Sequence, residues 1–221
     1  MRDWFMSKTV ASGSLRNSPK QPTARVLFCH GAGAPMDSQF MDTMAALLSG
    51  QGLDVVRVEF PYMAERRLTG KRRPPNPMPQ LLEFLEQQVS VWSAFDQLPL
   101  FVAGKSMGGR VAAMLACQEV SAVIALGYPL HPVGKPEKLR LEPLLARQCP
   151  LLIVQGERDL LGNRAEFDAL VLPERVLLHW LPDGDHDLKP RVKSGFTHLD
   201  HLQRTAQLIA AFTTDYVAHQ N

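Results

Sequence analysis

Residues 98–110 read LPLFVAGKSMGGR, an apolar run that leads directly into a glycine-rich turn. The apolar part, Leu98 to Ala103, predicts a buried strand, and the alanine-rich segment from Arg110 to Gln118 predicts a helix. Between them, Gly104 to Gly108 matches the pattern G-x-S-x-G, in which small residues permit a sharp strand-to-helix turn. Such a turn exposes its serine oxygen at the end of the strand. We therefore predict that Ser106 is a nucleophile.

The same alternation of short apolar runs and helical periodicity extends along most of the chain. Further strands are predicted at 26–30, 55–60, 122–126, 151–154 and 176–181, and further helices at 37–48, 81–95, 164–170 and 196–217. The basic, proline-rich residues 61–79 are predicted to form a loop. Apolar strands separated by helices are typical of a parallel sheet that is covered on both faces. We therefore expect a three-layer α/β/α sandwich with a mainly parallel sheet of about six to eight strands.

The length bounds the number of domains. A chain of 221 residues suffices for one domain with a buried core, and we assign residues 25–221 to that domain. Residues 1–24 are polar, so we expect them to form an N-terminal arm, an edge strand or a partly disordered segment. The interval 129–149 has room for a loop and one short helix, so no substantial cap domain is expected.

The charge balance and the hydropathy argue against two classes of partner. Lysine and arginine total 24 and aspartate and glutamate total 22, and the resulting net charge of +2 is too small for a dedicated nucleic-acid-binding protein. The first 25 residues contain no continuous apolar run of the kind found in signal peptides. No segment approaches the roughly 20 apolar residues that span a bilayer. We expect a cytoplasmic protein with no membrane partner, and the composition leaves its oligomeric state open.

The cysteines do not predict a metal site or a disulfide framework. Cys29, Cys117 and Cys149 are an odd number and contain no CxxC pair. Each lies in or beside an apolar run, so we expect buried thiols in a reducing compartment.

Two nucleotide-binding patterns overlap the glycine-rich segments, and the spacing excludes both. The tripeptide at 104–106 resembles the end of a phosphate-binding P-loop, whose first glycine would fall where Pro99 stands. The segment at 31–33, which reads GAG, would need a third glycine where Met36 stands to match a dinucleotide fingerprint. We therefore predict no nucleotide cofactor.

A serine hydroxyl needs a base to become a nucleophile, and the base needs a carboxylate that orients it. On sheets that carry such a turn, the acid and then the histidine follow the serine at the carboxyl ends of later strands. Asp159 comes soon after the strand at 151–154, and His186 follows the strand at 176–181, so we predict Asp159 as the acid and His186 as the base. One alternative acid and two alternative bases remain open: Glu157, His198 and His201.

A developing oxyanion needs two preorganised donors. We expect one of them to be the amide of Met107, directly after the serine. The other is predicted in the loop after the first strand of the sheet, where small residues let a substrate approach the backbone. We favour the amide of Ala32, with Gly31 and Gly33 as neighbours that also contact substrate. A plain strand-to-helix turn is the alternative for this loop.

Residues 66–73 read RRLTGKRR and contain five cationic side chains. Short basic runs are common in solvated loops and in nucleic-acid or localisation patches. A sharper interpretation follows from topology, because the preceding strand ends near Phe60, at the carboxyl edge where open parallel sheets bind ligands. In that interpretation Arg72 and Arg73 attract a substrate that carries a carboxylate or a phosphate.

Four blocks of the sequence together resemble a known family. They are residues 30–34 (HGAGA), 70–75 (GKRRPP), 104–110 (GKSMGGR) and 183–188 (DGDHDL). In this order they resemble the α/β-hydrolase superfamily from about Arg25 onward, and more narrowly its small dienelactone-hydrolase-like branch. That branch includes bacterial hydrolases, testis-expressed homologues and the hydrolase-like domain of the third subunit of the NSL chromatin complex. The resemblance implies the α/β-hydrolase fold and a catalytic triad of Ser106, Asp159 and His186.

The expected activity is that of a carboxylesterase-like serine hydrolase, which cleaves an ester or a related acyl bond through an acyl-enzyme. Dienelactone hydrolase itself uses a cysteine nucleophile, whereas this chain has Ser106, so the resemblance does not extend to that reaction. No metal or organic cofactor is expected, and the expected partner is a small-molecule acyl substrate. The alternative is a non-catalytic interaction module with the same fold, which the resemblance to the chromatin subunit keeps open.

Overall fold

The strands of the protein form one sheet. The structure, a computed structural model, describes residues 13–116 and 118–219, and in this part of the chain seven strands pair in the order β1-β3-β2-β4-β5-β6-β7. Strands β2 to β7 are parallel to their neighbours, whereas β1 pairs antiparallel with β3 at one edge. The strands are Ser14–Asn17 (β1), Ala24–Cys29 (β2), Leu53–Val58 (β3), Leu100–Lys105 (β4), Ala122–Leu126 (β5), Leu151–Gly156 (β6) and Val176–Leu181 (β7).

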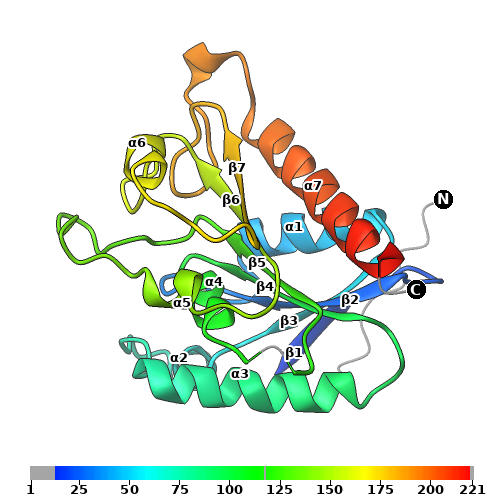
Figure 1. The fold of residues 1–221 in the computed structure, drawn as a ribbon. Coiled ribbons are helices and arrows are strands. Elements are labelled where there is room, and N and C mark those ends of the chain that lie inside the picture. The colour runs from blue at the N-terminus through cyan, green and yellow to red at the C-terminus, as the bar shows by residue number, and fades with distance from the viewer. Residues whose placement is uncertain (1–12, 117, 220–221) are drawn as a thin grey trace.

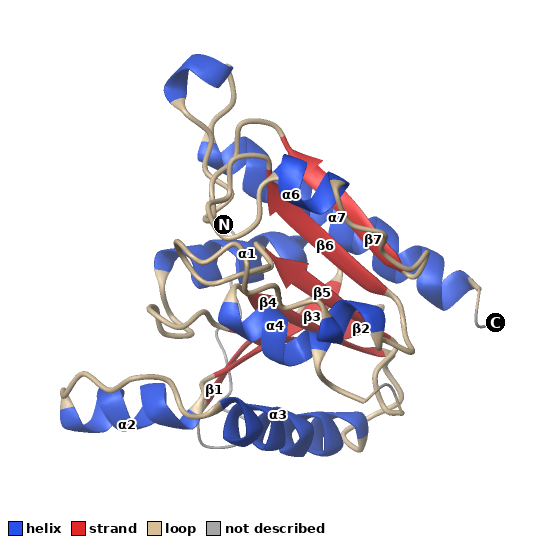
Figure 2. Cartoon of the chain, turned by 60° about the vertical axis from the view of Figure 1, so that its left-hand side comes forward, coloured by secondary structure: helices blue, strands red, loops and turns tan. Residues whose placement is uncertain are grey.

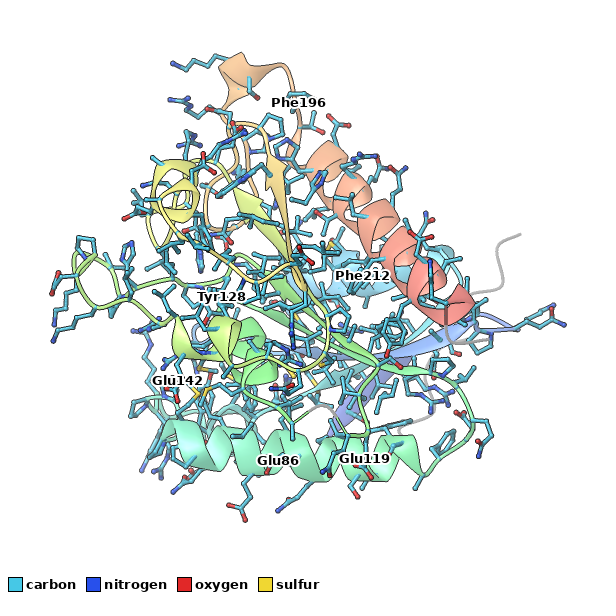
Figure 3. All side chains as sticks on the ribbon, in the orientation of Figure 1. Glu86, Glu119, Tyr128, Glu142, Phe196 and Phe212 are labelled. Carbon is cyan, nitrogen blue, oxygen red and sulfur yellow. The ribbon has the colours of Figure 1, made fainter. Side chains whose placement is uncertain are left out.

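Helices cover both faces of this sheet, as Figure 1 shows. The central strands β2 to β6 are buried along their whole length, which explains why their sequences are mostly apolar. Helices α3 (Met78–Ser93) and α4 (Met107–Ala113) pack on one face, and α1 (Gln39–Gly50) and α7 (His198–Ala218) pack on the other. On this second face Phe212 of α7, which is labelled in Figure 3, forms a ring contact with Phe101 of β4. The predicted three-layer sandwich with a mainly parallel sheet is confirmed.

Residues 61–79 are not a loop throughout, and the prediction is wrong for the first half of this stretch. Helix α2 spans Pro61–Thr69, with its proline at the first position, where an amide hydrogen is not needed. Gly70 ends the helix with a φ of 68°. Tyr62 and Met63 are buried, so their packing stabilises a helix in a segment whose charges and prolines suggest a loop.

The interval after β5 is short. It contains loops and the four-residue helix α5, Glu142–Leu145. Two other short helices, α6 (Arg164–Asp168) and the 3-10 helix η1 (Val192–Ser194), lie near the carboxyl ends of β6 and β7. The described residues contain no cap domain, which confirms the predicted lidless architecture.

The parallel strands end together at one edge of the sheet, which places their following loops side by side. Figure 2 shows the arrowheads of β5, β6 and β7 pointing the same way. Helix α4 starts at Met107, directly after the turn that follows β4, and not at Arg110 as predicted. Because the turn and the loops after β2, β6 and β7 share this edge, the predicted site residues come within reach of one another.

The predicted thiols differ from one another in the structure. Cys29 is a buried free cysteine, and burial raises the pKa of its thiol. Cys149 is disulfide-bonded, so the prediction of a free thiol is wrong there. Cys117 lies outside the described residues.

The N-terminal segment is described only in part. Residues 1–12 of the predicted arm or edge strand lie outside the described residues, and β1 takes the edge position beside β3. In the part of the chain that the structure describes, no helix combines the length and the apolar character needed to cross a membrane.

Candidate active site

Ser106 lies on a strained turn between β4 and α4. Its φ of 51° and ψ of −114° belong to a region that residues other than glycine rarely adopt. The turn is tight, because a Cβ atom at Gly104 would lie 2.2 Å from the carbonyl carbon of Gly108, and one at Gly108 would lie 2.6 Å from the carbonyl oxygen of His30. Only glycine fits at these two positions, so the pattern G-x-S-x-G reflects a close approach of backbones on both sides of the serine.

The three predicted side chains form one chain of hydrogen bonds. The Oγ atom of Ser106 lies 2.8 Å from Nε2 of His186, and Nδ1 of His186 lies 2.8 Å from Oδ2 of Asp159. Because a carboxylate only accepts, we assign the imidazole proton to Nδ1, which leaves Nε2 to accept from the serine hydroxyl. Asp159 is fully buried, whereas the His186 side chain is 27% exposed and reachable from solvent.

Asp159 is held by donors on both of its oxygens. Its Oδ1 accepts from the amide of Leu161 at 2.8 Å, and its Oδ2 accepts from Nε2 of Gln155 at 2.8 Å. Gln155 is fully buried, and its own Oε1 accepts from the amide of Tyr128 at 2.7 Å. The sequence interpretation missed Gln155, and the available signal was a polar residue within the otherwise apolar strand β6.

The predicted oxyanion donor Met107 lies directly after the serine, and the loop that carries the other, Ala32, approaches the serine at Gly31. Met107 follows it at the start of α4, and a Cβ atom at Gly31 would lie 3.7 Å from Cβ of Ser106. A Cβ atom at Gly33 would meet nothing within 4 Å, so the loop opens outward there. Among the described residues, no acceptor receives a hydrogen bond from the amide of Met107 or of Ala32. These two amides are therefore available to an oxygen atom of a ligand.

His30 and Tyr62 hold the carbonyl groups of this loop. The amide of Phe60 donates to Nε2 of His30 at 3.0 Å, so Nδ1 carries the proton and donates to the carbonyl oxygen of Gly31 at 2.7 Å. Burial lowers the pKa of His30 and keeps its ring neutral. The hydroxyl of Tyr62 donates to the carbonyl oxygen of Ala32 at 2.9 Å, and burial raises its pKa to about 12. The sequence interpretation assigned neither side chain a role.

The alternative acid and bases are engaged elsewhere. Oε2 of Glu157 accepts from the amide of Asp183 at 3.0 Å, and Oε1 pairs with Arg164 at 2.9 Å. His198 bonds to the carbonyl oxygen of Asp187, and the buried His201 bonds to that of Leu188, both at 2.9 Å. The structure thus brings Ser106, His186 and Asp159 together and leaves these alternatives outside the group.

Two of the five cations in the basic stretch are paired with carboxylates. Arg67 lies 2.7 Å from Glu59 and 2.8 Å from Asp37. Arg73 lies 2.6 Å from Glu65. Arg73 is thus paired with a carboxylate, and its attraction of an anionic substrate stays a prediction.

The remaining basic residues differ in their surroundings. Arg72 is exposed, and no hydrogen bond or ion pair of the described residues joins it or Arg73 to the serine, histidine and aspartate. Arg66 is half-buried and lines a cavity of about 220 Å³ together with Pro35 and Met63. Within the described part of the chain, Arg66 forms no ion pair. Since Pro35 closely follows Ala32, this cavity adjoins the predicted oxyanion loop.

No metal centre is formed by the described residues, in which no cluster of three or more histidine, cysteine, aspartate or glutamate side chains is suited to hold an ion. The arrangement described above is instead a hydroxyl, an imidazole and a carboxylate in sequence, next to two unused amides. Such a set can move a proton from the hydroxyl to the imidazole and can receive a negatively charged oxygen.

Comparison with known proteins places the chain among hydrolases. A family model described as "Alpha/beta hydrolase domain" matches residues 22–214. The crystal structure of a dienelactone hydrolase from Anabaena variabilis is similar, with 24% identity, coverage of 92% of this chain and 91% of that chain, and a TM-score of 0.69. An alpha-beta serine hydrolase homologue from Coxiella burnetii shares 20% identity over 90% of this chain and 89% of that chain, with a TM-score of 0.65. A Xanthomonas campestris a/b serine hydrolase described as without lid shares 19% identity over 88% of this chain and 85% of that chain, with a TM-score of 0.64. These identities show a shared fold, and because the family model spans most of the sequence, the chain belongs to the alpha/beta hydrolase family.

Proposed function

We propose that this chain is a cytoplasmic serine hydrolase that cleaves an ester or a related acyl bond of a small, anionic substrate. The observation that carries the proposal is the unbroken hydrogen-bonded path from Ser106 through His186 to Asp159, with 2.8 Å at each step. A hydroxyl at this distance from an imidazole whose Nε2 carries no proton can donate its proton to the ring and so act as a nucleophile.

The proposed reaction proceeds through an acyl-enzyme. Oγ of Ser106 attacks the acyl carbon while Nε2 of His186 takes the hydroxyl proton, and the buried Asp159 stabilises the resulting imidazolium. The amides of Met107 and Ala32 bind the oxyanion of the tetrahedral intermediate. His186 then returns the proton to the leaving alcohol. A water molecule, activated by the same imidazole, releases the acid and restores the serine.

The size and charge of the substrate follow from the surroundings of Ser106. Because the described residues contain no cap domain, little surface is available to bury a long acyl chain. Arg66 lines the cavity beside the predicted oxyanion loop, and the other lining residues are Pro35, Met63, Arg67 and Gly70. A short acyl group that ends in a carboxylate fits such a cavity, since an unpaired guanidinium binds carboxylates in a bidentate manner. Arg72 contributes to the long-range attraction as an exposed cation.

A fluorophosphonate probe tests the nucleophile, because it labels an activated serine whatever the natural substrate is. We expect labelling of the wild type and of the control Ser90→Ala, which changes an exposed serine of α3. Labelling should be absent in Ser106→Ala. Persistent labelling of Ser106→Ala would assign the nucleophile to another residue. An unlabelled wild type that binds a protein partner would support the non-catalytic interaction module instead.

A further inference from the structure

Lys105 is a buried lysine directly before the proposed nucleophile. It ends β4, and side chains along a strand alternate between its two faces. Phe101 and Ala103 of the same strand belong to the core under α1 and α7, so Lys105 points to that side of the sheet. Its side chain is only 9% exposed. Because burial of a charged group is unfavourable unless it is paired, the contacts of this ammonium group need an explanation.

The ammonium group of Lys105 contacts the segment that carries the proposed base. Its Nζ atom donates to the carbonyl oxygen of His186 at 2.8 Å and lies 3.2 Å from Oδ1 of Asp187. It also lies 5.7 Å from the ring centroid of Phe40 in α1. Burial lowers the pKa of Lys105, and the nearby carboxylate of Asp187 opposes this effect. The charge is thus accommodated by the backbone of one residue, the carboxylate of the next and an aromatic face.

Other backbone hydrogen bonds shape the segment around His186 but join it to parts of the chain other than β4. Oδ1 of Asp185 accepts from the amides of Asp187 and Lys189, at 2.9 Å and 3.0 Å, which closes the turn on itself. The amide of Arg158 donates to the carbonyl oxygen of Gly184 at 2.8 Å and so joins the turn to the loop after β6. Lys105 instead connects the strand that carries Ser106 to the backbone of the base itself.

We propose that Lys105 is a positioning residue, which holds His186 at hydrogen-bonding distance from Ser106 by binding the backbone carbonyl of His186 and the side chain of Asp187. This inference rests on the proposed function, since it assumes that His186 is the base. It assigns Lys105 no contact with substrate. A displacement of the imidazole by about 1 Å costs a serine hydrolase roughly a hundredfold in rate, so a tether at this point has a large effect on turnover.

Three variants test the tether. Lys105→Met keeps the aliphatic stem and removes both contacts, and Asp187→Asn removes the ion pair and keeps the bond to the His186 carbonyl. Lys189→Met is the matched control, because it removes an exposed lysine of the same loop. With p-nitrophenyl acetate, we expect Lys105→Met to lower kcat by about tenfold or more and to leave KM within about twofold. Asp187→Asn should lower kcat less, and Lys189→Met should match the wild type.

The pH dependence of kcat/KM separates positioning from a general loss of stability. The imidazole itself interacts with the carboxylates of Asp159 and Asp187. The ammonium group of Lys105 interacts with Asp159, Asp185 and Asp187, and His198 interacts with Asp187. Removing the cation favours the protonated imidazole, so Lys105→Met should shift the acid limb to higher pH by at least about 0.3 unit. Removing the anion in Asp187→Asn should shift that limb to lower pH. A variant that is merely less stable would not move the limb in either direction.

The outcomes distinguish this inference from the proposed function. Suppose that Ser106→Ala loses probe labelling, while Lys105→Met keeps the wild-type kcat and an unshifted acid limb. This result would leave the proposed function intact and overturn the positioning role of Lys105. If Lys105→Met does not fold, an unshifted limb in Asp187→Asn, whose side chain is 71% exposed, would overturn it instead. If the wild type neither hydrolyses esters nor binds the probe, the positioning role is tested by the downfield NMR resonance of the His186 Nδ1 proton. This resonance reports the geometry of the imidazole without turnover. An identical resonance in the wild type and Lys105→Met would then also count against the tether.

Discussion

Nε2 of Gln155 donates to Oδ2 of Asp159 at 2.8 Å, the same oxygen that accepts from Nδ1 of His186. The amide therefore fixes the position of the oxygen that orients the imidazole. The same amide nitrogen also lies 2.9 Å from the carbonyl oxygen of Gly162, so Gln155 joins β6 to the loop that carries Asp159. This link makes the orientation of His186 dependent on Gln155, which no hydrogen bond among the described residues joins to Ser106.

Replacing Gln155 with methionine should impair both stability and turnover. The amide of Tyr128 would lose its buried acceptor, which costs about 1–3 kcal/mol of the free energy of unfolding. The carboxylate of Asp159 would lose one of its donors, so kcat should fall while KM changes little. Urea denaturation and steady-state kinetics measure the two effects. Gln203→Met, at an exposed position of α7, is the control and should show neither effect.

The triad side chains should act as a unit. Ser106→Ala, Asp159→Asn and His186→Ala should each lower kcat, with a loss of roughly 10⁴-fold or more for the serine. A double variant such as Ser106→Ala with His186→Ala should be little worse than the worse single variant, because the remaining residues have no function without their partner. Multiplicative losses in the double variant would mean that the residues act independently.

The backbone of Ser106 predicts an unusual response of stability. At a φ of 51°, a side chain at this position is strained, and strain of this kind costs about 1–3 kcal/mol. Ser106→Gly should therefore be more stable than Ser106→Ala by about 1 kcal/mol, although glycine usually destabilises a protein. Thermal unfolding of the two inactive variants checks this. A less stable glycine variant would show that the turn is not strained in solution.

The buried His30 predicts a loss of stability in acid. Burial lowers the pKa of His30, so below about pH 6.5 the unfolded chain binds a proton that the folded state does not. The stability that the neutral ring contributes is present above this pH and is lost as the pH falls. Urea denaturation at pH 7 and pH 5 should show a steeper loss for the wild type than for His30→Gln. The pKa of His179 is also lowered by burial, and since both proteins retain His179, the difference between them isolates His30.

The cavity beside the oxyanion loop predicts a preference for anionic acyl groups. p-Nitrophenyl hydrogen succinate should have a higher kcat/KM than the neutral p-nitrophenyl butyrate, and this preference should shrink in Arg66→Gln. Added salt should weaken the long-range part of the attraction, because the Debye length is about 8 Å at physiological ionic strength. Arg73→Gln should change the preference less, since Glu65 pairs with that cation. Equal effects of Arg66→Gln and Arg73→Gln would argue against the cavity as the binding site.

The architecture was predictable because it depends on local patterns. An apolar run such as LFVA before a glycine-rich turn indicates a buried strand and a sharp bend, and the order of the later strands then places Asp159 and His186 at the same edge. Helix α2 was not predictable in this way, because its stability depends on the burial of Tyr62 and Met63 by distant parts of the chain. Its arginines and prolines alone favour a loop.

The supporting residues of the site were harder to predict for a related reason. Gln155 and Lys105 lie in strands whose other residues are mostly apolar, and nothing in the local sequence says which distant atoms they meet. The pairing of Arg67 with Glu59 and Asp37 likewise depends on the tertiary fold. The sequence gives only the number of cationic side chains in a basic run. The structure also shows which of these side chains are paired with carboxylates.

The absence of a cap domain from the described residues bears on the second half of the proposed reaction. An acyl group on Ser106 would stand at the sheet edge in contact with bulk solvent, and His186, the proposed base, is itself partly exposed. Nothing in such an arrangement selects water over a small alcohol. The acyl-enzyme should therefore partition between hydrolysis and alcoholysis according to the concentrations of water and alcohol, so that in alcohol-rich media the protein works as an acyltransferase.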